Sequence, residues 1–369
     1  MNGLNQLLNF PRFGASGVNK RMALLCQGID QVPAIKIVGS NGKGTTAHLV
    51  AEMAQRMGKK VGLYTSPHLL KVNERIKVNG LDISDRDLDD LLLWACARTE
   101  ALDGVGRFEI LTLAAIEYFT RCNVDLAVME IGLGGRFDPV RIARGNISVM
   151  TSLDLEHTAI LGNRLEDIAK EKAAVCQSGD VLLSAVGGIE ACLPDGVAYV
   201  DLSQPALSPL QSNARLAAHA LKRQFGLADL PDTFGVKVPG RLQKLSNDPP
   251  LYVDVAHSPA AVKTVLDHFK DRPISLVCAA RTDKDVQALD HVFHHVIAIQ
   301  PDETMKPADA ILSGFLSPKK DKAQDVAEAL SLAKEHLADH GMILCLGGFG
   351  LVGRVMAHIR GTHYDVISL

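Results

Sequence analysis

The chain is poor in several features that often decide a protein's class. Aromatic residues make up 5% of its 369 residues, and tryptophan occurs once. Seven cysteines are spread along the chain without a C-x-x-C pair, which is typical of a reduced protein that uses cysteine as a small core residue. No stretch reaches the ~18 apolar residues of a membrane span, and the N-terminus has no signal-peptide pattern. We therefore expect a cytoplasmic protein.

Positive and negative residues are nearly balanced in number. A formal net charge of −3 carries no signature of nucleic-acid or membrane binding, so we expect neither as a partner. Hydrophobic residues make up 47% of the chain, which is enough for sizeable cores, and the length predicts two domains or three. An anionic substrate would need local positive charge, which the overall balance does not reveal.

Residues 35–46, which read IKIVGSNGKGTT, are the most informative stretch. They predict a strand, a glycine-rich turn and the start of a helix that continues to about residue 57. This order is typical of a phosphate-binding loop, where backbone N–H groups and the helix N-terminus face phosphate oxygens. Lys43 would reach the terminal phosphates, and a threonine hydroxyl could face a metal ion. The candidate nucleotide-binding residues here are Gly39, Ser40, Asn41, Gly42, Lys43, Gly44 and Thr45.

This loop departs from the strict G-x-x-x-x-G-K-[ST] pattern. Position 37 is isoleucine, and Gly44 separates Lys43 from Thr45. The alternative is an ordinary glycine turn between a strand and a helix. The strand before the loop and the helix after it are the context that a phosphate-binding motif requires, and they favour the functional interpretation.

The rest of the chain alternates between predicted strands and helices, which favours an α/β fold with a doubly wound parallel sheet. Apolar runs predict strands at 61–64, 125–131, 147–152 and 181–185. Helical spacing predicts helices at 85–101, 108–119, 165–176 and 213–225, with a short helix before Pro11, whereas 186–210 is expected to be irregular.

A cluster of prolines and a glycine at 239–250 predicts a linker. A smaller α/β domain is expected after it, with strands at 251–255, 274–278, 296–299 and 342–346 and helices beginning at 260, 323 and 351. The predicted domains are residues 1–239 and 250–369. Near the end, GFGLVG at 348–353 matches G-x-G-x-x-G, but no strand ending in an acid follows it, so we interpret it as a tight strand-to-helix turn.

Several polar residues follow the predicted strands of the first domain, where ligands collect in open parallel sheets. The segment TSPH follows strand 61–64, and Glu130 ends strand 125–131 just before GLGGR. A carboxylate there is a candidate metal ligand, and the alternative is a solvated acid at a strand end. His157 follows strand 147–152, and from the residues alone it is more often a loop histidine making one hydrogen bond.

Ten segments in order along the chain together resemble one family. They are GSNGKGTT (39–46), YTSPHL (64–69), ERI (74–76), FE (108–109), EIGLGGR (130–136), LEHTAILG (155–162), IAKEKA (168–173), PGRLQ (239–243), DVAHSP (254–259) and DKD (283–285). Each segment alone is a weak signal, but jointly they are specific. The chain resembles the folylpolyglutamate synthase and dihydrofolate synthase branch of the Mur ligases.

The resemblance implies an N-terminal P-loop ATPase domain, a smaller C-terminal Rossmann-like domain, and an ATP-dependent amide ligase. In this family ATP converts a substrate carboxylate to an acyl phosphate, which the amino group of L-glutamate attacks. It implies Mg²⁺ held by Ser66, Glu130 and His157, and a carbamylated lysine at Lys172. Lys43, Lys172 and His157 are then the catalytic candidates. The remaining implied contacts are Asn213, Arg241, Asp254 and His257 with ATP, and Phe108, Glu109 and Asp138 with a pteroate or folate substrate.

The sequence departs from the family pattern in three places. The segment 138–141 reads Asp-Pro-Val-Arg where relatives commonly read D-A-T-N, Ser258 replaces an asparagine, and the stretch 186–240 is short. Proline removes a backbone donor and Arg141 adds a cation beside the substrate site. These departures leave a second hypothesis open, a paralogous Mur-type ligase acting on a different carboxylic acid. A P-loop kinase or a non-catalytic nucleotide-binding protein fits less well. We expect a monomer acting on small molecules.

Overall fold

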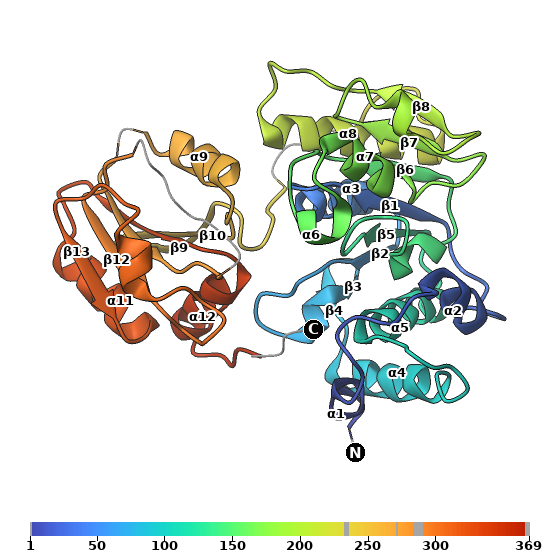
Figure 1. The fold of residues 1–369 in the computed structure, drawn as a ribbon, viewed down its shortest axis with the longest axis horizontal. Coiled ribbons are helices and arrows are strands. Elements are labelled where there is room, and N and C mark those ends of the chain that lie inside the picture. The colour runs from blue at the N-terminus through green and yellow to red at the C-terminus, as the bar shows by residue number, and fades with distance from the viewer. Residues whose placement is uncertain (1, 232–235, 271, 283–290, 366–369) are drawn as a thin grey trace. The chain divides into compact units, whose positions relative to one another are not determined.

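A computed structural model describes residues 2–231, 236–270, 272–282 and 291–365. The chain divides into two compact units (Figure 1). The first unit contains the residues up to Pro67 and Asn73–Val236, and the second contains His68–Val72 and the residues from Lys237 to Val366. The expected domain 1–239 is therefore interrupted, because Leu69 and Leu70 pack in the apolar core of the second unit.

The first unit is built on an eight-stranded sheet with the order β4-β3-β2-β5-β1-β6-β7-β8. Neighbouring strands from β2 to β8 in this order run parallel, whereas β3 pairs antiparallel with both β2 and β4. The strands are β1 (Ala34–Val38), β2 (Val61–Tyr64), β3 (Ile76–Val78), β4 (Leu81–Asp82), β5 (Leu126–Glu130), β6 (Ile147–Met150), β7 (Val181–Ser184) and β8 (Ala198–Asp201). The predicted parallel sheet is confirmed.

The helices of this part of the chain fall largely where the sequence predicts them. The α-helices are α1 (Gly3–Leu8), α2 (Val18–Leu25), α3 (Lys43–Arg56), α4 (Asp85–Ala97), α5 (Arg107–Arg121), α6 (Thr158–Leu161), α7 (Leu165–Ala173) and α8 (Pro209–Phe225). Short 3-10 turns are η1 (Val72–Arg75), η2 (Pro139–Ile142) and η3 (Glu190–Cys192). Helix α2 was not predicted, and the expected irregular stretch 186–210 contains both η3 and the edge strand β8.

One face of the first sheet packs against helices α3 and α8. Alternate side chains of the parallel strands point to this face, including Ile35 and Ile37 of β1, and meet Val50 of α3 and Leu221 of α8. All four are fully buried. Burying apolar surface at both faces explains why these strands have nearly continuous apolar sequences.

Lys36 points to the opposite face of β1 and carries a buried charge. Only 1% of Lys36 is exposed, and its Nζ lies 3.3 Å from an Asp180 carboxylate oxygen. Asp180 also accepts a hydrogen bond from the backbone N–H of Gln177 at 3.0 Å. This ion pair ties the central strand β1 to the turn before β7, because either charge would be costly to leave buried alone.

The second unit contains a six-stranded sheet with the order β13-β12-β11-β14-β10-β9. Its strands are β9 (Gln243–Asn247), β10 (Pro250–Asp254), β11 (Ile274–Cys278), β12 (His295–Ile299), β13 (Lys320–Ala323) and β14 (Met342–Leu346). Its helices are α9 (Pro259–His268), α10 (Ala308–Leu312), α11 (Val326–Glu335) and α12 (Phe349–Arg360). The stretch 239–250 expected as a linker instead contains β9, which pairs antiparallel with β10.

The turn at the end of β14 agrees with the sequence interpretation. Gly347 and Gly348 have φ angles of 143° and 89°, and helix α12 begins at Phe349 directly after them. Both glycines adopt a backbone conformation that other residues rarely reach. The motif G-x-G-x-x-G is here a tight turn from a strand into a helix.

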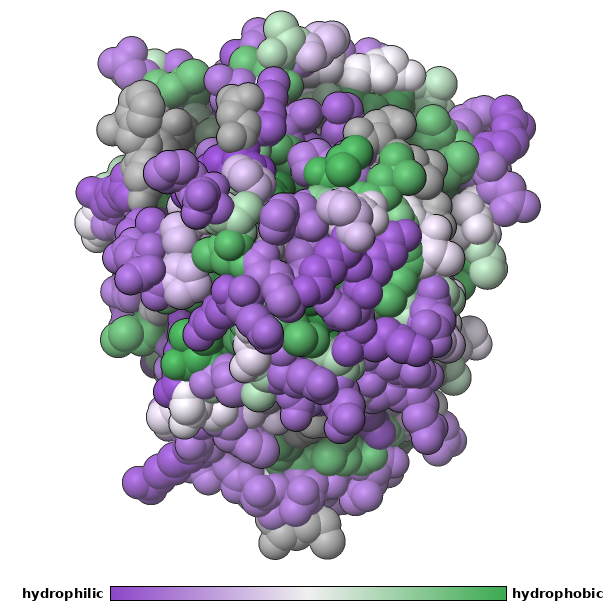
Figure 2. Space-filling view, turned by 90° about the vertical axis from the view of Figure 1, so that its left-hand side faces the viewer, coloured by the Kyte–Doolittle hydropathy of each residue, from purple (hydrophilic) through white to green (hydrophobic). Residues whose placement is uncertain are grey.

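The molecular surface shows no large apolar face in the view of Figure 2, where hydrophilic side chains predominate and apolar ones form small scattered areas. Among the described residues, no helix is long and apolar enough to cross a membrane.

Gly62 provides a test of packing in the first sheet. A Cβ at this position of β2 would lie 2.5 Å from a ring carbon of Phe119, which is fully buried. We expect Gly62→Ala to destabilise the protein by about 1–3 kcal/mol through overpacking. The melting temperature should fall by roughly 2–4 °C per kcal/mol for a unit of this size.

The double variant Gly62→Ala/Phe119→Leu serves as the control for this prediction. Because leucine is smaller than the phenylalanine ring that opposes Gly62, the two substitutions should be less than additive in their effect on the free energy of unfolding. Additive losses, or an unchanged melting temperature in Gly62→Ala, would contradict the proposed clash.

Candidate functional site

The glycine loop between β1 and α3 is held by the residues that end the neighbouring strand β6. The Thr151 hydroxyl donates to the Asn41 carbonyl at 2.6 Å, and the Asn41 N–H donates to the Ser152 hydroxyl at 2.8 Å. The Ser40 N–H donates to the Ser152 carbonyl at 2.9 Å. These contacts fix the loop backbone before any ligand binds, as a preformed phosphate site requires.

Two glycines make this close approach possible. Gly39 has a φ of 148°, and a Cβ there would lie 2.1 Å from the Thr151 hydroxyl oxygen. Gly42 has a φ of 83°, and a Cβ there would lie 2.8 Å from the Asn213 amide nitrogen. Asn213, predicted to contact ATP, therefore lies directly against the loop although α8 follows it far along the chain.

Lys43 is the first residue of α3 and folds back over the loop. Its Nζ donates to the Gly39 carbonyl at 2.8 Å and to the Ser40 carbonyl at 3.2 Å. The ammonium group is thus kept at the loop and the helix N-terminus, where it can meet an anionic phosphate chain. Thr45 and Thr46 are buried in the first turn of the helix.

Glu130 ends β5 on the other side of β1 from β6. Strand register places Glu130 beside Ile37, just before the glycine loop, and a Cβ at Gly44 would lie 3.5 Å from either Glu130 carboxylate oxygen. The Ser66 N–H donates to Glu130 Oε2 at 3.0 Å. The structure therefore brings together two of the predicted metal ligands, Ser66 and Glu130, at the phosphate loop.

These residues fit a hard cation such as Mg²⁺. A carboxylate and a serine beside a phosphate loop supply oxygen donors, and a glycine at position 44 leaves the space between loop and carboxylate free of a side chain. Among the described residues no group of three or more His, Cys, Asp and Glu side chains could hold a metal. A cation bound at Glu130 would therefore also need phosphate or water oxygens.

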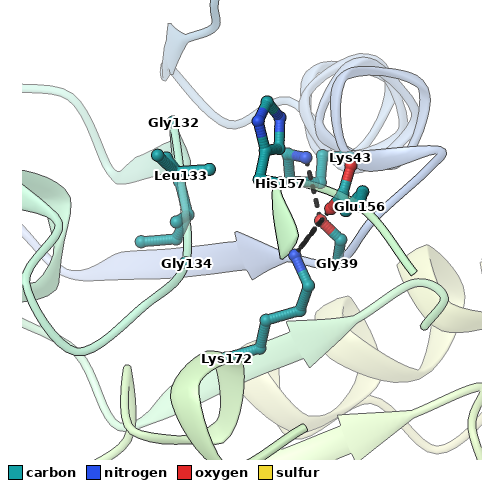
Figure 3. Close-up of a pocket in the computed structure, with 9 residues that line it drawn as sticks. Gly39, Lys43, Gly132, Leu133, Gly134, Glu156, His157 and Lys172 are labelled. Atoms are coloured by element: carbon teal, nitrogen blue, oxygen red, sulfur yellow. Dashed lines mark hydrogen bonds and ion pairs between the residues drawn. The ribbon is translucent and has the colours of Figure 1, made fainter. Parts of the chain in front are cut away.

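A pocket beside the loop contains the other predicted catalytic residues (Figure 3). His157 and Lys172 line it together with Lys43 and the backbone of the GLG segment after β5. His157 is the N-cap of the short helix α6 and has a φ of 46°, a left-handed conformation in which asparagine, aspartate and histidine are enriched among residues other than glycine. The third predicted metal ligand thus lies at the same pocket as Lys43.

Lys172 is 1% exposed and its ammonium group points at the glycine loop (Figure 3). Its Nζ donates to the Glu156 carboxylate at 2.9 Å and to the Gly39 carbonyl at 3.0 Å. Burial, assisted by the nearby charge of Lys43, lowers the pKa of Lys172. Burial alone would raise the pKa of Glu156, but Lys172 and Lys43 outweigh it and lower that pKa.

The carbamylation implied for Lys172 requires a neutral amine, which a lowered pKa favours. The Glu156 contact favours the ammonium form instead, and a carbamate would have to displace it. Glu156 was not among the predicted site residues. The segment LEHTAILG contains it, but sequence alone did not show that its carboxylate meets Lys172.

Asp138 is buried and binds backbone. Its Oδ2 accepts hydrogen bonds from the N–H groups of Gly132 at 2.9 Å and Leu133 at 3.0 Å, and its Oδ1 accepts from Val140 at 2.9 Å. The carboxylate therefore holds the GLGGR loop against the turn η2. Burial raises the pKa of Asp138 to about 6, although the three backbone N–H groups and Lys43 oppose the shift.

The two other substrate candidates lie at the start of α5. The Phe108 ring is 5.8 Å from the Tyr64 ring, and a Cβ at Gly132 would lie 2.8 Å from the Phe108 ring. Glu109, in contrast, is 2% exposed and forms an ion pair with Arg21 at 2.8 Å. Phe108 thus borders the GLG backbone, whereas the Glu109 carboxylate is occupied within the protein.

Arg141 contacts the end of helix α7, where its Nε donates to the Ala174 carbonyl at 2.7 Å. Pro139 is the first residue of η2, where a missing N–H is tolerated. The Val140 N–H still reaches Asp138, so the departure from D-A-T-N keeps the local backbone contact.

In the second unit, three predicted residues gather at the carboxyl end of β10. Arg241 lies 3.8 Å from Asp254, and Asp254 also accepts from the N–H groups of Leu242 at 2.8 Å and Ala256 at 2.7 Å. Burial raises the pKa of Asp254, with Arg241 acting against it. A His257 ring nitrogen lies 2.9 Å from the Val255 carbonyl oxygen.

Ser258 has a local structural role that explains why serine can replace the asparagine of the family pattern. It is the N-cap of α9, and its hydroxyl accepts a hydrogen bond from the Ala261 N–H at 3.4 Å. Serine and asparagine are both good N-caps, so the replacement preserves this function. The remaining motif of the family pattern, DKD at 283–285, lies outside the described residues.

The buried Asp138 predicts a pH-dependent stability difference. Its folded-state pKa of about 6 lies above the ordinary 3.8, so the folded state binds this proton more tightly. Stability from this group is therefore gained as the pH falls through 6 and is complete below about 4, in total of order 3 kcal/mol. Asp138→Asn cannot gain it.

Urea titrations of the parent and Asp138→Asn at pH 7.5, 6 and 4.5 measure this effect. The parent should gain unfolding free energy relative to the variant as the pH falls across that window. A difference between the two proteins that stays constant with pH would show that Asp138 titrates normally.

The chain is similar in sequence to known proteins. A family model described as the Mur ligase glutamate ligase domain matches residues 240–349. The dihydrofolate synthase/folylpolyglutamate synthase of Bacillus subtilis is 32% identical over 74% of this chain and 77% of that protein. A probable bifunctional folylpolyglutamate synthase/dihydropteroate synthase of Haloferax volcanii is 30% identical over 95% of this chain. This chain spans about half of that longer protein, 49% of its length.

Solved structures show the same fold. A bifunctional folylpolyglutamate synthase/dihydrofolate synthase from Yersinia pestis, complexed with AMPPNP and a Mn ion, has a TM-score of 0.82, with 24% identity over 94% of both chains. FolC of E. coli in complex with ADP also has a TM-score of 0.82, with 25% identity over 97% of this chain and 96% of that one. By its identity to the Bacillus protein over most of both chains, this chain belongs to the folylpolyglutamate synthase/dihydrofolate synthase family of the Mur ligase superfamily.

Proposed function

We propose that this protein is an ATP-dependent ligase that adds L-glutamate to dihydropteroate, to reduced folates, or to both. The observation that carries the proposal is the preformed glycine loop, which brings Lys43, Glu130 and Lys172 to one place. Relatives named as dihydrofolate synthase/folylpolyglutamate synthase, and relatives solved with nucleotide and Mn, support it.

The reaction proceeds in two steps. A carboxylate oxygen of the substrate attacks the γ-phosphorus of ATP, the bond to the β-phosphate oxygen breaks, and ADP leaves. The neutral amino group of glutamate then attacks the carbonyl carbon of the acyl phosphate, inorganic phosphate leaves, and the amine loses a proton. The product is an amide, and no oxidant or reductant is needed.

The residues of the loop would act by position and charge. Phosphoryl transfer depends on neutralising and aligning the phosphate oxygens more than on covalent help. Lys43 would neutralise charge on the transferred group, and Ser66, Glu130 and His157 would hold Mg²⁺. When bound, Mg²⁺ supplies further charge neutralisation at the phosphates. Lys172 would fix the loop through Gly39 or, if carbamylated, supply an additional anion.

The second unit would contribute nucleotide contacts. The Arg241 side chain is 31% exposed, and its Nη1 lies 3.8 Å from the buried Asp254 carboxylate. A guanidinium is well suited to phosphate oxygens. His257 follows on the same segment. We propose that these residues bind ATP, as the resemblance implies.

Phe108 and Asp138 favour a pteridine-containing carboxylate. The Phe108 ring offers an aromatic surface beside the GLG backbone that Asp138 positions. The alternative, a different carboxylic acid, rested on the altered segment 138–141, in which proline removes a backbone donor and Arg141 adds a cation. The Arg141 Nε donates to the Ala174 carbonyl, a contact that leaves the guanidinium charge in place, so this acid remains the second candidate substrate. We also propose that the protein acts as a monomer in the cytoplasm, without nucleic-acid or membrane partners.

The decisive experiment measures phosphate release from ATP and product mass with dihydropteroate and L-glutamate. Phosphate release should require both substrates, and the product should be the glutamate adduct. We expect Lys43→Ala to fold normally and to lose about 10²-fold or more in kcat, because the transferred phosphoryl group loses its counter-charge.

Controls separate the alternatives. ADP and a stable phosphorylated substrate formed without an amino acid, with no release of inorganic phosphate, would favour a kinase. Product from another carboxylic acid but not from pteridines would favour the paralogous ligase. A near-normal kcat in a folded Lys43→Ala variant would remove the loop lysine from the mechanism.

Glu130 is tested by its magnesium dependence. Glu130→Gln keeps the size of the side chain but removes the charge that would hold the cation. Half-maximal activity should therefore need at least about tenfold more Mg²⁺, or activity should vanish. Asp180→Asn, a buried acid away from the loop, should keep the parental magnesium dependence. Equal dependence in both variants would assign Glu130 a structural role.

A further inference from the structure

The N-terminal segment lies across the start of helix α5. The Arg107 N–H donates to the Pro11 carbonyl at 2.9 Å, and the Ala15 N–H donates to the Gly104 carbonyl at 2.8 Å. The Arg107 guanidinium donates to the carbonyls of Phe10 at 2.7 Å and Leu8 at 2.8 Å. Residues 8–17 are thus fixed to the turn that precedes Phe108.

Arg21 and Glu109 form the centre of this arrangement. The Arg21 Nε donates to Glu109 Oε1 at 2.8 Å and its Nη2 to Glu109 Oε2 at 3.0 Å. The same guanidinium donates to the carbonyls of Ser16 and Ala15, both at 2.7 Å. Glu109 Oε2 also accepts from the Gly106 N–H at 2.9 Å. Two charged side chains therefore bind three backbone groups, which belong to the two segments 15–16 and 106.

The packing around this pair leaves no room for a side chain at three glycines. A Cβ at Gly14 would lie 2.0 Å from Glu109 Oε2, and a Cβ at Gly106 would lie 2.3 Å from the Gly14 nitrogen. A Cβ at Gly104 would lie 2.7 Å from the Ala15 Cβ. We call residues 13–17, the turn 104–106, Arg21 and Glu109 the N-terminal clasp.

The clasp is joined to the substrate side of the site through two neighbours. Phe108, which precedes Glu109, packs against Gly132 of the GLG backbone. Asn19, on helix α2, donates from its side-chain amide to the Arg136 carbonyl at 3.0 Å. A change in the Arg21–Glu109 pair would therefore shift both Phe108 and the segment after GLG, while the glycine loop is held separately by Thr151 and Ser152.

We infer that Arg21 and Glu109 are positioning residues for the carboxylate substrate, and that Glu109 acts through Arg21 and the backbone instead of contacting substrate. The inference rests on the proposed function and concerns the acid that is activated. The pair holds loop 13–17 and the Phe108-bearing end of α5 in one geometry. The nucleotide loop does not depend on it.

The test uses Glu109→Gln and a matched control. The control is Asp180→Asn. The Asp180 carboxylate is also buried, pairs with the buried cation Lys36 and accepts one backbone N–H, so this substitution likewise removes the charge of a buried, paired acid. In Glu109→Gln, an amide NH₂ would face the guanidinium, so the clasp loosens. We expect the KM for dihydropteroate to rise about tenfold or more, because small misplacements of positioning residues are costly.

The KM for ATP in Glu109→Gln should remain within about twofold of the parent, and Asp180→Asn should leave both KM values unchanged. Thermal denaturation of the two variants shows whether they lose comparable stability. Equal KM values for dihydropteroate in parent and Glu109→Gln, or a parallel rise for ATP, would overturn the inference. A parent enzyme inactive with every carboxylate tested would overturn the proposed function instead.

Three further variants, Arg21→Lys, Arg21→Met and Gly14→Ala, cover the case in which Glu109→Gln does not fold. Arg21→Lys keeps the charge but not the fork of donors, so its KM for dihydropteroate should lie between those of the parent and Arg21→Met. Gly14→Ala keeps the charges of Arg21 and Glu109, but its Cβ would clash with the Glu109 carboxylate and displace loop 13–17. It should raise the same KM without changing that for ATP, and a parental KM in all three variants would refute the positioning role.

Discussion

The glycine loop depends on two short hydroxyl side chains at the end of a neighbouring strand. Thr151 and Ser152 bind the backbone of Asn41, and they reach it only because Gly39 has no side chain. The central place of β1 between β5 and β6 makes this possible. Strand β6 supplies the support for the loop and leads to Glu156 and His157, while β5 supplies Glu130 on the other side. The order of the strands in this sheet therefore brings the glycine loop, Glu130 and His157 to the same edge.

Three buried cations among the described residues form ion pairs with carboxylates, but the pairs serve different purposes. Lys36 and Asp180 join a central strand to a turn, Lys172 and Glu156 lie under the glycine loop, and Arg21 and Glu109 fix the N-terminal segment. Because desolvation offsets much of the attraction in a buried pair, such pairs are poor evidence of stability. Their directional hydrogen bonds are better evidence of position, and two of the three hold backbone next to the proposed site.

The sequence predicted the central strands and missed the edges. Strands β1, β2, β5, β6 and β7 have largely apolar sequences because both faces are covered, and all were expected. Strands β8, β9 and β13 lie at sheet edges and are partly exposed, so their side chains carry no such pattern. An edge strand forms because a partner offers free backbone groups, which local sequence does not show.

The same reason limited the prediction of the site. The glycine loop is local in sequence, and its strand, turn and helix were recognised together. The pair Arg21–Glu109 joins residues 88 apart, and Lys172–Glu156 joins residues 16 apart across separate elements. A loop of glycines with a lysine indicates phosphate binding from local sequence alone, whereas an acid in a helix does not indicate which cation will be its partner. Partners of this kind become visible only when the fold is known.

Hydrogen-bond capacity separates acids that face a ligand from acids that face the protein. A carboxylate offers about four acceptor sites. Asp138 accepts three backbone N–H groups, and Glu109 accepts two guanidinium hydrogens and one backbone N–H. Acids so engaged influence a substrate mainly through the backbone they hold. The segment after Asp138 can then change in sequence without losing its function, provided that the backbone contacts persist. Pro139 and Val140 meet that condition, since the first needs no N–H there and the second still donates one.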